Sequence, residues 1–101
     1  MGITIQLEDE SGNPEGELLL DTFLFLAIPQ ATNSSYACLR FIDLYGNTIF
    51  NRLQIPVLIE ELHRIADIAK TNEDKQFLTK LLTLTEKCRA KPHLYLRFIG
   101  D

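Results

Sequence analysis

The densest group of chemically capable side chains lies in the stretch FIDLYGNTIFNRLQ, residues 41–54. A carboxylate, a phenol, an amide and a guanidinium occur there, and an imidazole follows on the next predicted helix. If a pocket gathered these groups, they could bind a polar small molecule or transfer protons during catalysis. The side chains that would form such a site are Asp43, Tyr45, Asn51, Arg52 and His63.

The same stretch also contains what a tight turn requires. A type I turn centred on residues 44–45 would place Asp43 opposite Asn47 and Phe41 opposite Ile49. Apolar side chains would then face each other, as a half-buried sheet needs. In this arrangement Asp43 is expected to accept a hydrogen bond from a turn amide.

Three further residues of the stretch have structural interpretations. Gly46 would supply the positive φ that is needed after the turn. Asn51 and Gln54 precede a predicted helix, and their side chains could bond the first amides of that helix, which have no partner inside it. Tyr45 and Arg52 are not explained in this way, and aromatic and arginine side chains of this kind anchor protein interfaces.

The rest of the chain contains no pattern typical of a catalytic, cofactor or metal site. No HExxH, glycine-rich phosphate loop, GxSxG or cluster of Cys and His occurs. The adjacent Glu60 and Glu61 point in different directions on a helix and cannot share a proton. Cys38 and Cys88 are far apart and have no second pair beside them, so each is expected to be a small buried apolar residue. We therefore expect no enzymatic activity, no cofactor and no metal.

Composition indicates one compact domain. The chain has 101 residues, of which 46% are hydrophobic, enough for one core but not for two, so residues 1–101 are expected to form a single domain. The longest apolar run, residues 23–28, is far shorter than the roughly 20 residues that span a bilayer. We therefore expect a cytoplasmic protein that does not bind membranes. The net charge of −4 disfavours nucleic acid as a partner, although basic residues are concentrated at 75–97.

Hydrophobic periodicity predicts the elements that position these residues. Alternating apolar and polar side chains predict strands, and helical spacing predicts two helices joined as an antiparallel hairpin. The apolar residues 18–28 fit a strand or a short helix equally well. The predicted strands cover residues 3–8, 37–43, 48–52 and 93–99, and the predicted helices cover residues 56–70 and 73–90. This order predicts an α+β fold in which an antiparallel sheet of about four strands packs on the helical hairpin.

Each predicted helix has an apolar face that should meet the sheet. These faces consist of Leu58, Leu62, Ile65 and Ala69 in the first helix and of Phe77, Leu78, Leu81, Leu82, Thr85 and Cys88 in the second. The charged side chains of the first helix are expected to face solvent. They are Glu60, Glu61, Arg64, Asp67 and Lys70.

A longer pattern runs through the same part of the chain. Its fixed positions are Asp43, Tyr45, Gly46, Thr48, Phe50, Asn51 and Gln54, followed by a C-terminal Gly100-Asp101. This Asp-x-Tyr-Gly-x-Thr-x-Phe-Asn-x-x-Gln pattern resembles a family of small bacterial proteins of unknown function, over residues 37–101. The resemblance implies a common fold for this part and no particular activity.

We therefore expect a non-catalytic protein-interaction module that could associate with itself or with another protein. Its contact surface would be the tip of the predicted hairpin or an exposed sheet edge, with Tyr45 and Arg52 as candidate interaction residues. The alternative is a small-molecule-binding or catalytic site around the five side chains named first. A concave pocket that gathers them would favour the alternative, whereas a flat or protruding hairpin would favour the interaction module.

Overall fold

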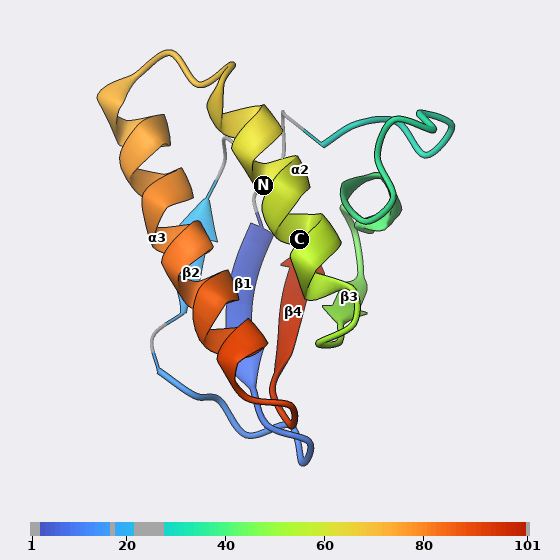
Figure 1. Cartoon of the computed structure of the whole chain (residues 1–101), viewed down its shortest axis with the longest axis vertical. Coiled ribbons are helices and arrows are strands. Elements are labelled where there is room, and N and C mark those ends of the chain that lie inside the picture. Colours follow the sequence, from blue (N-terminus) through green and yellow to red (C-terminus); the bar gives the residue numbers. More distant parts are fainter. Residues whose placement is uncertain (1–2, 17, 22–27, 101) are drawn as a thin grey trace.

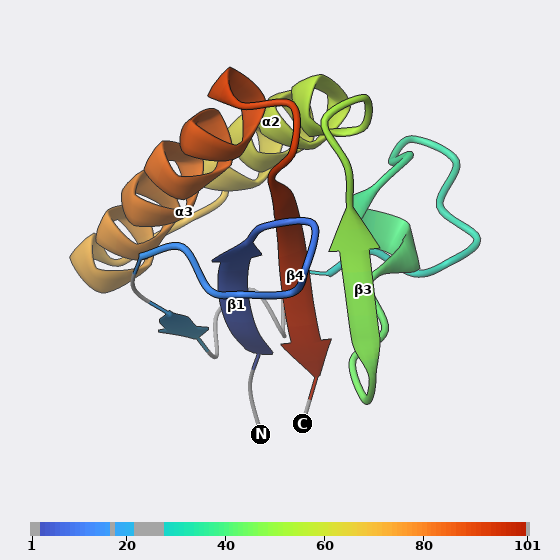
Figure 2. The same cartoon turned by 90° about the horizontal axis from the view of Figure 1, so that it is seen from below.

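The computed structural model describes residues 3–16, 18–21 and 28–100 and has the predicted α+β fold. Four strands form an antiparallel sheet in the order β2-β1-β4-β3, and two helices lie side by side over one face of it (Figure 1, Figure 2). The strands are β1 (Ile3–Glu8), β2 (Leu19–Asp21), β3 (Asn47–Phe50) and β4 (Tyr95–Gly100). The helices are α2 (Ile55–Ala66) and α3 (Asn72–Ala90), and η1 (Leu39–Phe41) is a short 3-10 turn.

The two central strands, β1 and β4, follow the expected period of two. Their pairing places Ile5 opposite Phe98 and Leu7 opposite Leu96, and all four side chains are buried against the helices. The alternate residues of both strands face the other side of the sheet. The strand predicted at residues 93–99 begins slightly later, because the residues after α3 first form a turn.

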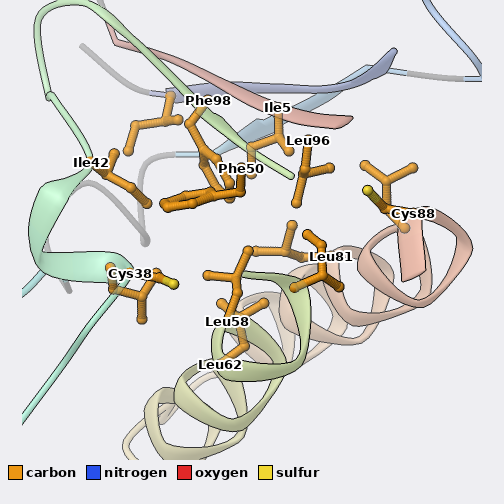
Figure 3. Close-up of a cluster of buried hydrophobic side chains, with 14 of the residues drawn as sticks. Ile5, Cys38, Ile42, Phe50, Leu58, Leu62, Leu81, Cys88, Leu96 and Phe98 are labelled. Atoms are coloured by element: carbon orange, nitrogen blue, oxygen red, sulfur yellow. The ribbon is translucent and has the colours of Figure 1, made fainter. Parts of the chain in front are cut away.

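The two helices form the predicted hairpin, and their apolar faces rest on the sheet. α2 ends at Ala66 rather than at the predicted residue 70, because the next amides, of Ile68 and Ala69, bond to carbonyls three residues back. Thr71 caps α3 through a hydrogen bond from the amide of Asp74 to its Oγ1, 3.1 Å long. Figure 3 shows Leu58, Leu62 and Leu81 between the helices and the sheet. Of the expected helix faces, the partly buried members are Phe77 and Leu82, and the other members are buried.

The core is continuous from the helices to both central strands and β3. The rings of Phe50 and Phe98 meet edge to face, with centroids 5.6 Å apart. Cys38 and Cys88 are buried in this core and are not disulfide-bonded (Figure 3). Their predicted role as small buried residues is confirmed.

The predicted strand at residues 37–43 is wrong. These residues form η1 and an irregular segment that flanks α2, and Leu39 and Ile42 are buried three positions apart instead of alternating (Figure 1). The predicted hairpin register, with Phe41 opposite Ile49, is therefore also wrong. β3 pairs with β4 instead, which places Phe50 opposite Leu96 and joins two buried apolar side chains. The strand predicted at residues 48–52 is accordingly shorter, because it ends at Phe50.

The predicted exposure of Glu61 is wrong as well. Glu61 is only 2% exposed, although it belongs to a helix that is charged on its outer side. The amides of residues 37–39 donate to its carboxylate, so these amides cannot contribute to a sheet. The long-range contact thus explains both errors.

The undecided segment at residues 18–28 is partly resolved. Residues 19–21 form β2, which pairs with β1 so that Ile5 lies opposite Leu19. Residues 22–27 lie outside the described part of the chain, and the prediction for them stays open. None of the described helices has the length and hydrophobicity needed to cross a membrane.

Candidate functional site

Side chain to backbone hydrogen bonds build the turn that leads into β3. Asp43 Oδ1 accepts from the amide of Tyr45 at 2.9 Å, and the Asp43 amide donates to Oγ1 of Thr48 at 2.8 Å. The amide of Gly46 donates to the carbonyl of Asp43 at 3.4 Å. The turn is therefore centred on residues 44–45, the position that the spacing predicts.

Gly46 provides space in this turn rather than positive φ. The described glycines with positive φ lie elsewhere in the chain, so the prediction of positive φ at Gly46 is wrong. A Cβ at Gly46 would lie 2.6 Å from Oδ2 of Asp43. Gly100 is restricted more strictly, since a Cβ there would overlap the backbone of Leu44 rather than a side chain that can move. The two glycines let the turn pack closely against the end of β4.

Asn51 and Gln54 form a reciprocal cap at the start of α2. Asn51 Oδ1 accepts from the amides of Leu53 and Gln54, at 3.0 and 3.2 Å. Gln54 Oε1 accepts from the amide of Asn51 at 2.9 Å. This is the arrangement of a capping box, with asparagine in the position that serine or threonine often occupies. The two amide side chains thus fix the direction in which the chain leaves β3.

The candidate interaction residues Tyr45 and Arg52 lie at opposite ends of β3. Tyr45 is 73% exposed in the turn before the strand, and Arg52 is exposed in the turn after it. Between them Ile49, 45% exposed, lies on the sheet face away from the helices. Within a single chain, Tyr45 and Arg52 are therefore separated by the length of β3 and do not belong to one pocket.

The five side chains of the alternative site are not gathered. Asp43 and Tyr45 precede β3, Asn51 and Arg52 follow it, and His63 lies on the outer side of α2. There His63 lines an open groove of about 580 Å³ between α2 and α3, and none of the other four residues lines this groove. Among the described residues, no three His, Cys, Asp or Glu side chains are placed to hold a metal ion.

Sequence reasoning missed a clamp on α2 that holds residues 35–39. Glu61 Oε2 accepts from the amide of Ala37 at 2.5 Å, and Glu61 Oε1 accepts from that of Leu39 at 2.9 Å. One turn later, Arg64 Nη1 donates to the carbonyl of Ser35 at 2.6 Å, and its guanidinium lies 4.1 Å from the ring centroid of Tyr36. The one available signal was an acid and an arginine at i, i+3 on the same helix, a pattern that solvent-exposed helices also show.

A second missed group is the ion pair of Glu8 and Arg97, on the sheet face away from the helices. The guanidinium donates to both carboxylate oxygens, with Nε to Oε2 at 3.0 Å and Nη2 to Oε1 at 2.9 Å. Gln6 adds a bond to Oε2 at 2.9 Å. The bond to Glu8, which is only 4% exposed, raises the pKa of Arg97. Because β1 and β4 are neighbours, this pair joins the two central strands.

The two cysteines are poorly suited to nucleophilic chemistry. Burial raises the pKa of Cys88 to about 11. Burial also raises the pKa of Cys38 to about 11, and the negative charge of Glu61 adds to this shift. A reactive cysteine needs a lowered pKa and access to solvent. Both thiols lack these properties and contribute to the packing of the core.

The outer edge of β3 is the remaining candidate surface. The amide of Gly100 donates to the carbonyl of Gly46 at 2.7 Å, which fixes the residues of β3 that face β4. Backbone groups of an antiparallel strand point to alternate sides, so those of Asn47 and Ile49 point away from β4. Within residues 3–16, 18–21 and 28–100, these outward groups have no hydrogen-bond partner.

Part of the preceding segment packs on the helix side of the sheet. The close approach of Leu44 to Gly100 is on the helix side of the sheet, because Gly100 pairs with the inward-facing Ile3. Leu39 and Ile42 are buried on that same side. Figure 2 shows β3 as the last strand of the sheet on this side.

Comparison with protein-family models, with curated proteins and with solved structures finds no match to this chain. The resemblance to a bacterial family therefore stays a prediction from the sequence pattern.

Proposed function

We propose that this protein is a non-catalytic interaction module that binds a protein partner by strand addition at the outer edge of β3. The observation that carries this proposal is the set of outward N–H and C=O groups of Asn47 and Ile49, which lack a partner in the described structure. An edge strand with unpaired backbone groups is a template for one more strand.

The composition of β3 supports this role. Soluble proteins usually protect a sheet edge with a lysine, a proline, an inward-pointing charge or a covering segment. β3 has the sequence Asn-Thr-Ile-Phe and contains neither a charge nor a proline. The outward-facing Ile49 is partly exposed, and exposed Tyr45 lies just before the strand. The sequence of β3 therefore lacks the charge and the proline that commonly prevent pairing at a sheet edge.

The short length of β3 makes side-chain anchors necessary. Asn47 and Ile49 offer four outward backbone groups, and each hydrogen bond contributes roughly 1 kcal/mol net. Association costs roughly 4–15 kcal/mol in lost translational and rotational freedom. Backbone pairing alone is therefore insufficient. Tyr45 and Arg52, at the two ends of the strand, are the residue types that provide such anchors.

Site-specific photo-crosslinking in cells tests the proposal. A benzophenone amino acid at Asn47 places the probe beside the outward edge, and the same probe at exposed Lys87 on α3 is the control. We expect an adduct from position 47, identified by mass spectrometry, and a much weaker one from position 87.

A proline substitution then tests whether the adduct depends on the outward backbone N–H groups of β3. Ile49→Pro removes an outward N–H without removing a bond to β4, a substitution that edge strands tolerate. Ile49→Val keeps the N–H and is the matched control. The adduct should disappear in the proline variant and persist in the valine variant. Equal adducts from both variants, or none from position 47 in either, would contradict strand addition at β3.

A further inference from the structure

We infer that the partner at the β3 edge is a second copy of this chain, whose β3 pairs antiparallel with the first about a two-fold axis at Thr48. This inference rests on the proposed function and names its partner. It follows from the symmetry of the edge and from the charges at its two ends.

The backbone of the edge is complementary to itself. Asn47 and Ile49 carry the outward N–H and C=O groups, and Thr48 lies between them. An antiparallel copy centred on Thr48 places Asn47 of one copy opposite Ile49 of the other, at both positions. Every outward group of β3 then has a partner, and the same patch is used on both copies, as two-fold symmetry requires.

The charges at the ends of the strand select the antiparallel direction. Asp43 lies before β3 and Arg52 lies after it, and both side chains are exposed. In the described structure neither takes part in a salt bridge. A parallel arrangement would bring like charges together, which disfavours association. The antiparallel arrangement instead brings each arginine to the acidic end of the other copy.

The register brings the two candidate interaction residues together. The turn that carries Asp43 and Tyr45 precedes β3, and the turn that carries Arg52 follows it, so the antiparallel direction brings the first turn of one copy to the second turn of the other. The guanidinium then sits beside the carboxylate of Asp43 and the ring of Tyr45, where charge pairing and cation–π contact are both available. The contact occurs twice, once at each end of the paired strands. The separation of Tyr45 and Arg52 in a single copy is thus what a two-fold interface needs.

Sedimentation velocity over a concentration series tests the self-association. Arg52→Glu should raise the dimer dissociation constant by about tenfold or more, because like charges then meet at both ends. Lys70→Glu makes the same change in charge in the exposed loop between the helices and should leave the constant nearly unchanged. Tyr45→Ala should also weaken association, because it removes an exposed ring from the end of the strand that meets Arg52 of the other copy.

Disulfide trapping tests the register. Asn47→Cys and Ile49→Cys chains, mixed under oxidising conditions, should form the mixed disulfide faster than either variant forms a disulfide alone. Cysteines directly opposite each other on paired strands are close enough to bond, and diagonal ones are farther apart. The native cysteines are buried and do not compete. Equal rates for the mixture and the single variants would overturn the register.

The outcomes separate the inference from the function on which it rests. A monomer at all concentrations, with a different protein crosslinked at position 47, would overturn the second copy as partner and leave strand addition intact. A dimer that Arg52→Glu and Ile49→Pro both leave unchanged would overturn the second copy at the β3 edge, and an adduct from position 47 that Ile49→Pro also leaves unchanged would overturn strand addition as well. A concentration-dependent dimer lost in Arg52→Glu, with the mixed disulfide favoured, is the result that we expect.

Discussion

The carboxylate of Glu61 determines the path of the chain before β3. It accepts hydrogen bonds from the amides of Ala37, Cys38 and Leu39, and two of these three residues are buried. A buried amide without an acceptor is costly. The Glu61 carboxylate is therefore needed for η1 and the residues before it to pack against α2. The fold places the charge of Glu61 beside three donors instead of in water.

We predict that Glu61→Ala lowers the free energy of unfolding by about 3 kcal/mol, because it leaves buried amides unpaired. Urea denaturation followed by circular dichroism measures this loss. Glu60→Ala changes the exposed neighbouring acid and should stay within about 0.5 kcal/mol. Equal urea midpoints for the two variants would mean that the amides have other acceptors.

We predict that the two buried cysteines make the protein less stable at alkaline pH. Burial raises their pKa from 9.0 to about 11 in the folded state. Between these values the unfolded chain has released the thiol protons while the folded chain still holds them, so rising pH favours unfolding. At pH 10 the loss should be about 1 kcal/mol per thiol relative to pH 8.

Urea unfolding at the two pH values, with the Cys38→Ala/Cys88→Ala double variant as control, isolates this contribution. The double variant should show a smaller decrease between pH 8 and pH 10 than the natural chain. The same decrease in both proteins would assign the alkaline loss to other groups.

At the scale of elements, β3 is fixed at each end by hydrogen bonds from polar side chains that lie within a few residues of it in the sequence. Asp43 and Thr48 shape the entry to the strand, and Asn51 and Gln54 shape its exit into α2. The strand between them makes ladder bonds on one side only, to β4. An edge strand that is fixed at both ends can keep its extended shape without a second neighbour.

The cap of α2 gives a prediction at this scale. Asn51→Ala should lower the free energy of unfolding by about 1 kcal/mol, because the amide of Leu53 loses its acceptor and the amide of Gln54 keeps only the backbone carbonyl of residue 51. Gln54→Ala should cost less, and the double variant should cost less than the sum because both side chains belong to one cap. Leu53→Ala changes an exposed side chain of the same turn and serves as the control for urea denaturation.

At the scale of the whole molecule, one core joins the helix pair to the sheet. β1 and β4 are the inner strands, and the paired Glu8 and Arg97 link them on the face away from the helices. The helices cover the opposite face through their apolar sides (Figure 1). The stability of the molecule therefore depends on how completely this single interface is filled.

The core gives a prediction for the whole fold. Leu62→Ala and Leu81→Ala should each lower the free energy of unfolding by about 2–5 kcal/mol, since both side chains are fully buried and their removal leaves cavities. Ile68→Ala removes a side chain that is 59% exposed and should have a much smaller effect. Thermal and urea unfolding of the three variants provide the comparison. A similar stability for all three variants would mean that the buried faces of the helices have been assigned incorrectly.

The sequence by itself determined the parts of this protein that depend on local periodicity and local hydrogen bonds. The alternation in residues 3–8 and the helical spacing of Leu58, Leu62 and Ile65 predict β1 and the buried face of α2. The turn at residues 44–45 could also be located, because its hydrogen bonds join residues a few positions apart. Such features need no knowledge of what lies across the core.

Only the tertiary structure decided the features that depend on distant partners. Residues 37–43 have the composition of a strand, but Glu61 takes their amides and directs them into η1. The same contact buries an acid that the helical pattern places in water. β3 pairs with β4, which lies far along the chain, and this choice leaves the Asn47 and Ile49 edge open. Backbone donors and acceptors are alike in every residue, so their partners are selected by the packing of the whole chain rather than by the residues nearby.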